Sequence, residues 1–186
     1  MHNYHDTHGR LPPAVVYGKY GQPLHSWRVL LLPYIEQKDL YAQFHLDEPW
    51  DSQHNKKLLA MMPKTYVSPQ QDEKSIKEHE TYYQGFVGKD AFFEGKKGLR
   101  YPADFPDGTS NTIMIVEASK AVPWTKPEDI VYDPDKPLPK LGLPGSWSYL
   151  ASLCDGSVRT ITAKLTQRTL RLAITRNDGM PMGPDW

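Results

Sequence analysis

The sequence predicts an α+β fold in which short helices come first, antiparallel strands follow and one short helix ends the chain. Three observations predict this order. Apolar residues keep a near-helical spacing from Trp27 to Phe44. Residues 111–118 contain a continuous apolar run, which is typical of a central strand covered on both faces. Asp155-Gly156 is a two-residue hairpin signal between two further strand-like segments. We therefore expect helices on one face of a small antiparallel sheet.

The size and charge of the chain restrict the classes of partner. Its 186 residues fit one domain, so we expect residues 1–186 to form a single globular unit. Lys plus Arg and Asp plus Glu each number 22, so the formal charge is zero. A neutral chain offers no electrostatic footprint for nucleic acid and no polybasic membrane patch. No apolar run approaches the ~20 residues that cross a bilayer.

Residues 1–8 have the features of a helix end. His2 and His5 would lie one turn apart, Gly9 follows at a position typical of a C-terminal cap, and Pro12-Pro13 prevent continuation. A segment this short is not stable as a helix on its own. We therefore expect residues 1–8 to be the C-terminal end of a truncated, longer N-terminal helix. A native start at Met1 with a frayed tail is the alternative.

The next signals divide the chain into short elements. Ser26 is a candidate N-cap for the helical pattern that starts at Trp27, and Pro33 should kink or split that helix. Six prolines lie between Ser119 and Trp147, so residues 119–146 are expected to form an extended proline-rich loop. The other expected elements are a short helix at 51–62, a mobile polar loop at 70–80, strands at 81–88, 146–153 and 157–161, and a helix at 166–175.

Metal sites have weak support. His2, His5 and His8, with Asp6 between them, follow a ligand-like spacing, but a solvated polar helix end explains them better. Acidic residues in 104–107 and 128–135 lack the spacing of an EF-hand loop. We expect no cofactor, and the acidic loops leave calcium as the open alternative.

The sequence predicts a separate environment for each of two residues, Cys154 and Glu117. Cys154 is the only cysteine, which excludes an internal disulfide and a cysteine-based zinc cluster, and its apolar neighbours favour a buried, inert thiol. Glu117 ends the strongest apolar strand, so its carboxylate needs a partner such as an arginine or a set of N–H groups. Arg100 and Arg159 are the candidate partners, and a structural ion pair is the preferred interpretation.

The aromatic residues allow two interpretations. Five tryptophans and eleven tyrosines could line a groove for a glycan or small solute, with Trp124 and Trp147 as the candidate ligand-binding residues. They could equally fill the core of a small sheet with long loops. The sequence contains no phosphate-binding glycine loop, no Gly-x-Ser-x-Gly, no His-Glu-x-x-His and no dinucleotide fingerprint. We therefore expect a protein that is not an enzyme.

Several segments together resemble a large planctomycete family of prepilin-like proteins with a C-terminal His-x9-Asp-Gly signature (domain of unknown function 1559, also labelled a bacterial solute-binding protein family). The matching segments are 2–13, 26–37, 107–113, 116–118, 122–138 and 155–159. The signature histidine is missing, because the residues about ten positions before Asp155 are Pro144 and Gly145. The positions that match the family motifs, for which the expected role is structural, are Trp27, Arg28, Asp107, Asn111, Glu117, Asp155 and Gly156.

The resemblance implies a fold and a function. Members of this family look like type IV pilins or type II secretion pseudopilins, which have a long apolar N-terminal helix followed by a soluble head. It implies a pilin-like head, and a non-enzymatic structural subunit that is extracytoplasmic and membrane-anchored through the missing helix. Its partners would be other pilin-like subunits joined by that helix, and the fragment alone would be a monomer or a weak oligomer. The alternative is an extracytoplasmic solute- or glycan-binding module with aromatic-lined loops that include Trp124 and Trp147.

Overall fold

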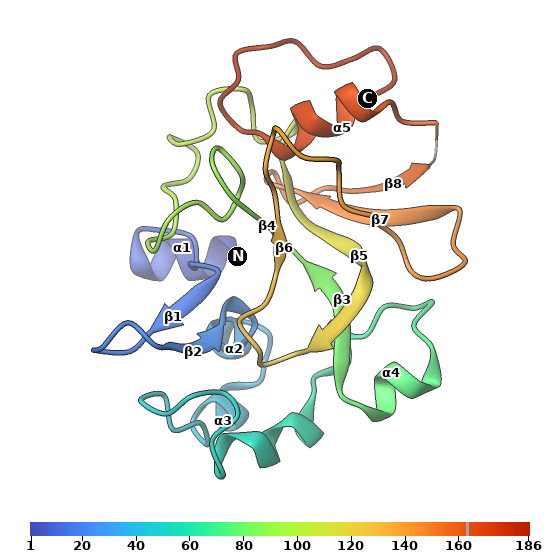
Figure 1. The fold of residues 1–186 in the computed structure, drawn as a ribbon. Helices are drawn as coiled ribbons and strands as arrows, with labels where there is room; N and C mark the ends of the chain where they lie inside the picture. Colours follow the sequence, from blue (N-terminus) through green and yellow to red (C-terminus); the bar gives the residue numbers. More distant parts are fainter. Residues whose placement is uncertain (163) are drawn as a thin grey trace.

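The computed structural model describes residues 1–162 and 164–186 (Figure 1). Its main sheet is antiparallel, with the strand order β3-β5-β7-β8. The strands are β3 (Glu80–Gln84), β5 (Ile113–Pro123), β7 (Ser148–Leu153) and β8 (Val158–Thr162). Short helices and this small antiparallel sheet confirm the α+β class. The apolar segment 111–118 forms the inner strand β5, as its pattern predicts.

One face of the main sheet packs against the C-terminal helix α5 (Gln167–Ile174), which lies above β7 and β8 in Figure 1. Val116, Ala151 and Ile161 share one buried cluster with Ala173 and Ile174 of that helix. The side chain of Thr166 accepts a hydrogen bond from the N–H of Thr169 and so caps the helix, as expected for a helix that starts at this position. The helix thus closes one face of the sheet.

The N-terminal third forms short helices and a two-stranded ribbon. The elements are α1 (His2–His8), β1 (Val15–Tyr17), β2 (Pro23–Ser26), α2 (Trp27–Leu30), η1 (Leu32–Tyr34), α3 (Lys38–Tyr41), η2 (Asn55–Met61) and η3 (Lys64–Tyr66). Ser26 caps α2 by accepting a hydrogen bond from the N–H of Arg28, and the helix ends just before Pro33, as predicted. The predicted helix at 51–62 is present as η2, which is a 3-10 helix.

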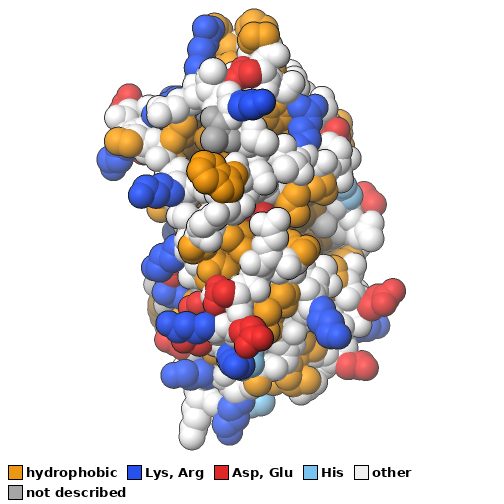
Figure 2. Space-filling model, turned by 90° about the vertical axis from the view of Figure 1, so that its right-hand side faces the viewer, with side chains coloured by type: hydrophobic (Ala, Val, Ile, Leu, Met, Phe, Trp, Pro, Cys, Tyr) orange, Lys and Arg blue, Asp and Glu red, His pale blue; other side chains and the backbone are white. Residues whose placement is uncertain are grey.

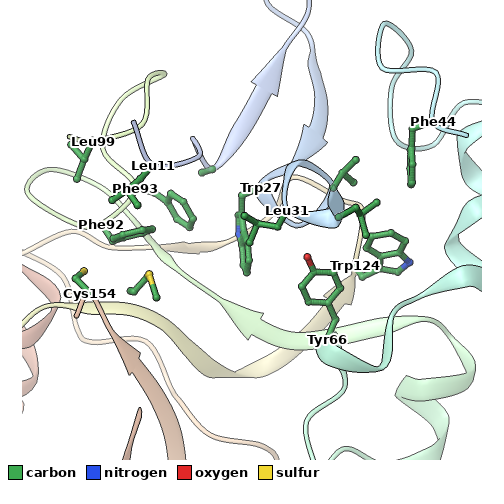
Figure 3. Close-up of a cluster of buried hydrophobic side chains, with 14 of the residues drawn as sticks. Leu11, Trp27, Leu31, Phe44, Tyr66, Phe92, Phe93, Leu99, Trp124 and Cys154 are labelled. Carbon is green, nitrogen blue, oxygen red and sulfur yellow. The ribbon is translucent and has the colours of Figure 1, made fainter. Parts of the chain in front are cut away.

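A second core cluster lies between these helices and the sheet. Figure 3 shows Trp27 and Leu31 beside Tyr66 and Trp124, with the phenylalanine side chains Phe92 and Phe93 further along the same cluster. Trp124 is 0% exposed and donates a hydrogen bond from its indole N–H to the carbonyl of Leu59. The aromatic residues of this region therefore fill the core.

Two expectations about loops were wrong. Residues 70–80 contain the helix α4 (Glu73–Lys77), because Asp72 caps it by accepting a hydrogen bond from the N–H of Ser75. Residues 119–146 are not one extended loop: β5 continues to Pro123, where it pairs with Glu80 of β3. Further on, β6 (Ile130–Val131) pairs in parallel with β4 (Phe86–Val87). In the described residues, no helix has the length and apolar composition needed to cross a membrane.

Candidate functional site

Helix α1 is attached to the tip of the β7–β8 hairpin. The Nε2 atom of His2 lies 2.8 Å from the carbonyl oxygen of Cys154, so the ring donates its proton there. The same ring packs against Tyr101 with 4.5 Å between the ring centroids, and it lies beside Gly156. A bond from a helix to a hairpin 152 positions later fixes the start of the helix on the sheet.

The other end of α1 is held by stacked rings. Tyr4 and His8 stack with 4.0 Å between their centroids, and Tyr4 packs edge-on against Tyr34 at 5.6 Å. The hydroxyl of Tyr34 also lies 3.3 Å from Nδ1 of His8. No residue of α1 is fully buried. Because a seven-residue helix is unstable alone, these contacts at both ends are what hold it.

The hairpin tip that receives His2 is itself joined to the turn before β5. The N–H groups of Asp155 and Cys154 donate to the carbonyls of Thr109 (3.0 Å) and Thr112 (2.9 Å). The Asp155 carboxylate accepts from the hydroxyl and N–H of Ser157, and these hydrogen bonds lower the pKa of Asp155. Gly156 has φ 89°, a conformation that suits glycine at this tight turn.

The turn before β5 reaches the C-terminal segment. The carboxylate of Asp107 accepts hydrogen bonds from the N–H groups of Asp178 (2.6 Å) and Gly179 (3.1 Å). The side chain of Asn111 closes the turn by donating to the carbonyl of Asp107 at 2.8 Å. Asp107 therefore links the sheet to the chain that follows α5.

A buried ion pair joins α2 to the loop before β6. Arg28 and Asp129 are 0% and 1% exposed at their side chains and lie 3.1 Å apart. The carboxylate also accepts from the indole N–H of Trp27 and the N–H of Gly85, while Arg28 donates to the carbonyl of Tyr83. Burial raises the pKa of Asp129 and lowers that of Arg28, and their mutual attraction opposes both shifts.

Glu117 lies at the floor of a hollow on the opposite face of the sheet from α5. The hollow measures about 100 Å³ and is bordered by Pro69, Gln70 and residues of β7 and β8. Glu117 is 2% exposed, and its two oxygens accept from the Ser68 hydroxyl (2.6 Å) and the Leu150 N–H (2.7 Å). The expectation of an ion pair with Arg100 or Arg159 was therefore wrong, because hydroxyl and N–H donors already meet the carboxylate.

Residues 1–90 match the model of a family described as Protein of unknown function (DUF1559), SBP_bac_10. This match, residues 1–90 (the DUF1559 segment), covers just under half of the chain. No curated protein and no solved structure matches the chain. Of the positions that match the family motifs, Trp27 and Arg28 lie inside the DUF1559 segment, and the other five lie beyond it, namely Asp107, Asn111, Glu117, Asp155 and Gly156. The buried ion pair therefore ties the DUF1559 segment to the second half of the chain.

The structure does not bring Trp124 and Trp147 to one groove. Trp124 is closed inside the core, whereas Trp147 is 89% exposed just before β7. The histidines of α1 turn toward different neighbours, and within residues 1–162 and 164–186 no group of three or more His, Cys, Asp or Glu side chains could hold a metal. Burial raises the pKa of the Cys154 thiol, which is 1% exposed.

Two features of the structure were not predicted from the sequence: the ion pair between Arg28 and Asp129, and the hollow at Glu117. Asp129 was considered only as part of an acidic loop, although its partner Arg28 stands in an apolar helical pattern, which is a signal for a buried charge. The hollow at Glu117 was missed because Ser68 and Leu150, which hold the carboxylate, come from distant parts of the chain.

Proposed function

We propose that this protein is a non-enzymatic, pilin-like structural head that is held by its N-terminal helix in an extracytoplasmic assembly. The observation that supports this proposal is the attachment of α1 at both ends, through His2 at the hairpin tip and Tyr4 and His8 at Tyr34. A head carried by a helix needs a fixed angle between the two. A loosely tethered helix would not set the orientation of the head in an ordered assembly.

The charge of the chain suits packing beside identical subunits. Its formal net charge is zero, so neighbouring copies do not repel one another through net charge. Most ion pairs lie at the surface and contribute little each, as in Lys74–Glu78 and Lys77–Glu73. We expect residues 1–186 alone to be a monomer or a weak oligomer in solution, because the assembly contacts of this proposal run through a helix upstream of α1.

The proposal is tested on the full-length gene product expressed in its native host. We expect it to fractionate with membranes and to be shortened by removal of a leader. His2→Ala should weaken assembly into that fraction, whereas Asn3→Ala, on the exposed side of α1, should leave it unchanged. A product found in the soluble fraction with no leader removed would overturn the proposal.

Solute binding is a second candidate function, and the hollow beside Glu117 is the observation that favours it. The lining of the hollow includes the buried carboxylate of Glu117 and the aromatic residue Tyr149. Recessed polar groups beside an aromatic surface are typical of small-ligand sites. Titration of the protein with pools of amino acids, carboxylates and sugars, read by tryptophan fluorescence, tests this candidate.

A further inference from the structure

Glu117, Leu150 and Thr160 form a row across three strands of the main sheet, on the face opposite α5. Leu150 pairs with Thr160, and Val116 pairs with Ala151, so Glu117 and Leu150 are the next pair in the same register. Side chains alternate along a strand, and Val116 and Ala151 pack in the cluster on the α5 side. The three residues of the row therefore point to the other side, where all three border the hollow.

The carboxylate of Glu117 is buried without a partner of opposite charge. Its two oxygens accept from the Ser68 hydroxyl and the Leu150 N–H, and neither donor is charged. Two donors at two oxygens suit an ionised carboxylate, which only accepts hydrogen bonds. Throughout the part of the chain that the structure describes, no Lys, Arg or His side chain forms an ion pair with Glu117. A buried charge that lacks a partner is strongly destabilising, so a cation in the hollow would be bound favourably.

The surroundings of the hollow supply no positive charge either. The other residues that border it are all uncharged, namely Pro69, Gln70, Ser148, Tyr149, Leu150 and Thr160. Figure 2 shows the side of the molecule that carries α4 and the turn before β7, where hydrophobic and uncharged side chains gather in the middle of the face. Charges attract one another more strongly in a recess of low dielectric constant than in open water.

The size of the hollow limits the cation to a small group. A volume of about 100 Å³ holds roughly three waters at ~30 Å³ each, so an ammonium group with two carbon atoms fits and a whole amino acid does not. An ammonium group has three protons to donate, and a carboxylate can accept about four hydrogen bonds, of which Glu117 receives two from the protein. The exposed side chains of Gln70 and Thr160 offer further oxygens at the border.

We propose that the Glu117 hollow binds the primary ammonium group of a small aliphatic amine. The ammonium donates to the Glu117 carboxylate and to the side-chain oxygens of Gln70 and Thr160, and its carbon chain lies against Pro69 and Leu150. An anion is disfavoured, because its charge would face the recessed carboxylate. A calcium ion is disfavoured, because it takes six to eight oxygen ligands and the hollow offers one carboxylate. The inference rests on the second candidate function and names its ligand class.

The test is an NMR titration of the whole chain, labelled with ¹⁵N, with ethylamine and propylamine. The reporter is the amide signal of Leu150, whose N–H lies 2.7 Å from Glu117. Ethanol and sodium chloride are the comparisons for shape and for charge. We expect the signal to shift and saturate with the amines alone. Glu117→Gln keeps the shape and removes the charge, so it should weaken binding by about tenfold or more. The matched control is Glu80→Gln, which changes a half-buried glutamate of the same sheet outside the hollow and should leave affinity unchanged.

A second variant keeps the proposal falsifiable if Glu117→Gln alters the fold. Thr160→Val removes one hydroxyl at the border with little change of shape and should weaken amine binding several-fold. An equal response to ethanol or to sodium chloride would overturn the proposal, and so would a loss of binding in Glu80→Gln as large as that in Glu117→Gln. A Leu150 shift with a sugar or a carboxylate, and none with the amines, would overturn the amine proposal and leave solute binding standing. No shift with any of these ligands would overturn both.

Discussion

Replacing Arg28 by methionine tests how the two halves of the chain are held together. Methionine fills much of the same space and removes the donors to Asp129, to Ser26 and to the carbonyl of Tyr83. Removing one partner of a buried pair costs about 3–5 kcal/mol, because a buried charge is left uncompensated. This is a large part of the roughly 5–15 kcal/mol that stabilises a typical domain.

The expected loss is measurable by urea unfolding, followed by circular dichroism. The urea concentration at the unfolding midpoint of Arg28→Met should fall. The slope of the unfolding free energy against urea concentration should change little. The melting temperature should fall by about 6–20 °C, since each kcal/mol corresponds to roughly 2–4 °C in a domain of this size. Arg10→Met is the matched control, because Arg10 is exposed and donates only to the carbonyl of Gly98. It should change stability by less than about 0.5 kcal/mol.

A double variant separates the ion pair from the loss of packing. Arg28→Met with Asp129→Leu removes both charges, so it should recover part of the stability that Arg28→Met alone loses. The reasoning would be refuted if Arg28→Met were as harmless as Arg10→Met. It would also be refuted if the double variant lost as much stability as Arg28→Met and Asp129→Leu lose when each is made alone and the two losses are added. The two charges would then contribute independently.

Three further predictions concern single positions at which the chain packs closely. A Cβ on Gly98 would lie 1.5 Å from the Leu11 carbonyl oxygen, so Gly98→Ala should cost about 1–3 kcal/mol in urea unfolding, and a neutral result would contradict the packing there. Cys154 should not react with a thiol reagent in the native protein and should react once urea unfolds it. Burial lowers the pKa of His25, so the unfolded chain takes up its proton first as pH falls below about 6.5, and the free energy of unfolding should decrease. His25→Leu should make the free energy of unfolding depend less steeply on pH below about 6.5. If the pH dependence were unchanged, groups other than His25 would be responsible for it.

The elements that could be predicted are those whose signals are local. The cap at Ser26, the stop before Pro33 and the cap at Thr166 act within a few residues, and each is present in the structure. The central position of residues 111–118 follows from a run of apolar side chains that needs cover on both faces. These signals were enough to predict the α+β class.

The features that could not be predicted depend on distant partners. β5 runs past Ser119 because Glu80 pairs with Pro123, and no pattern in either segment reports that pairing. Glu117 is held by Ser68, 49 positions before it, and by the backbone of β7. The helix α4 had a usable signal at Asp72, but the charged composition of its segment favoured a loop. A candidate site that is assembled from several strands is therefore less predictable than the strands themselves.

The two proposed roles use opposite ends of the same strand. His2 contacts Cys154 just after the end of β7, and the hollow is bordered by Ser148 and Leu150 near its start. Six positions of a strand span about 20 Å, so the helix and a solute bound in the hollow do not compete for space. Figure 1 places α1 on one side of the molecule and the turn before β7 on the other. His2→Ala should therefore leave solute binding at the hollow intact, and Thr160→Val, at the border of the hollow, should leave the attachment of α1 intact. If one substitution impaired both, the strand would couple the two sites, and they would have to be treated as one.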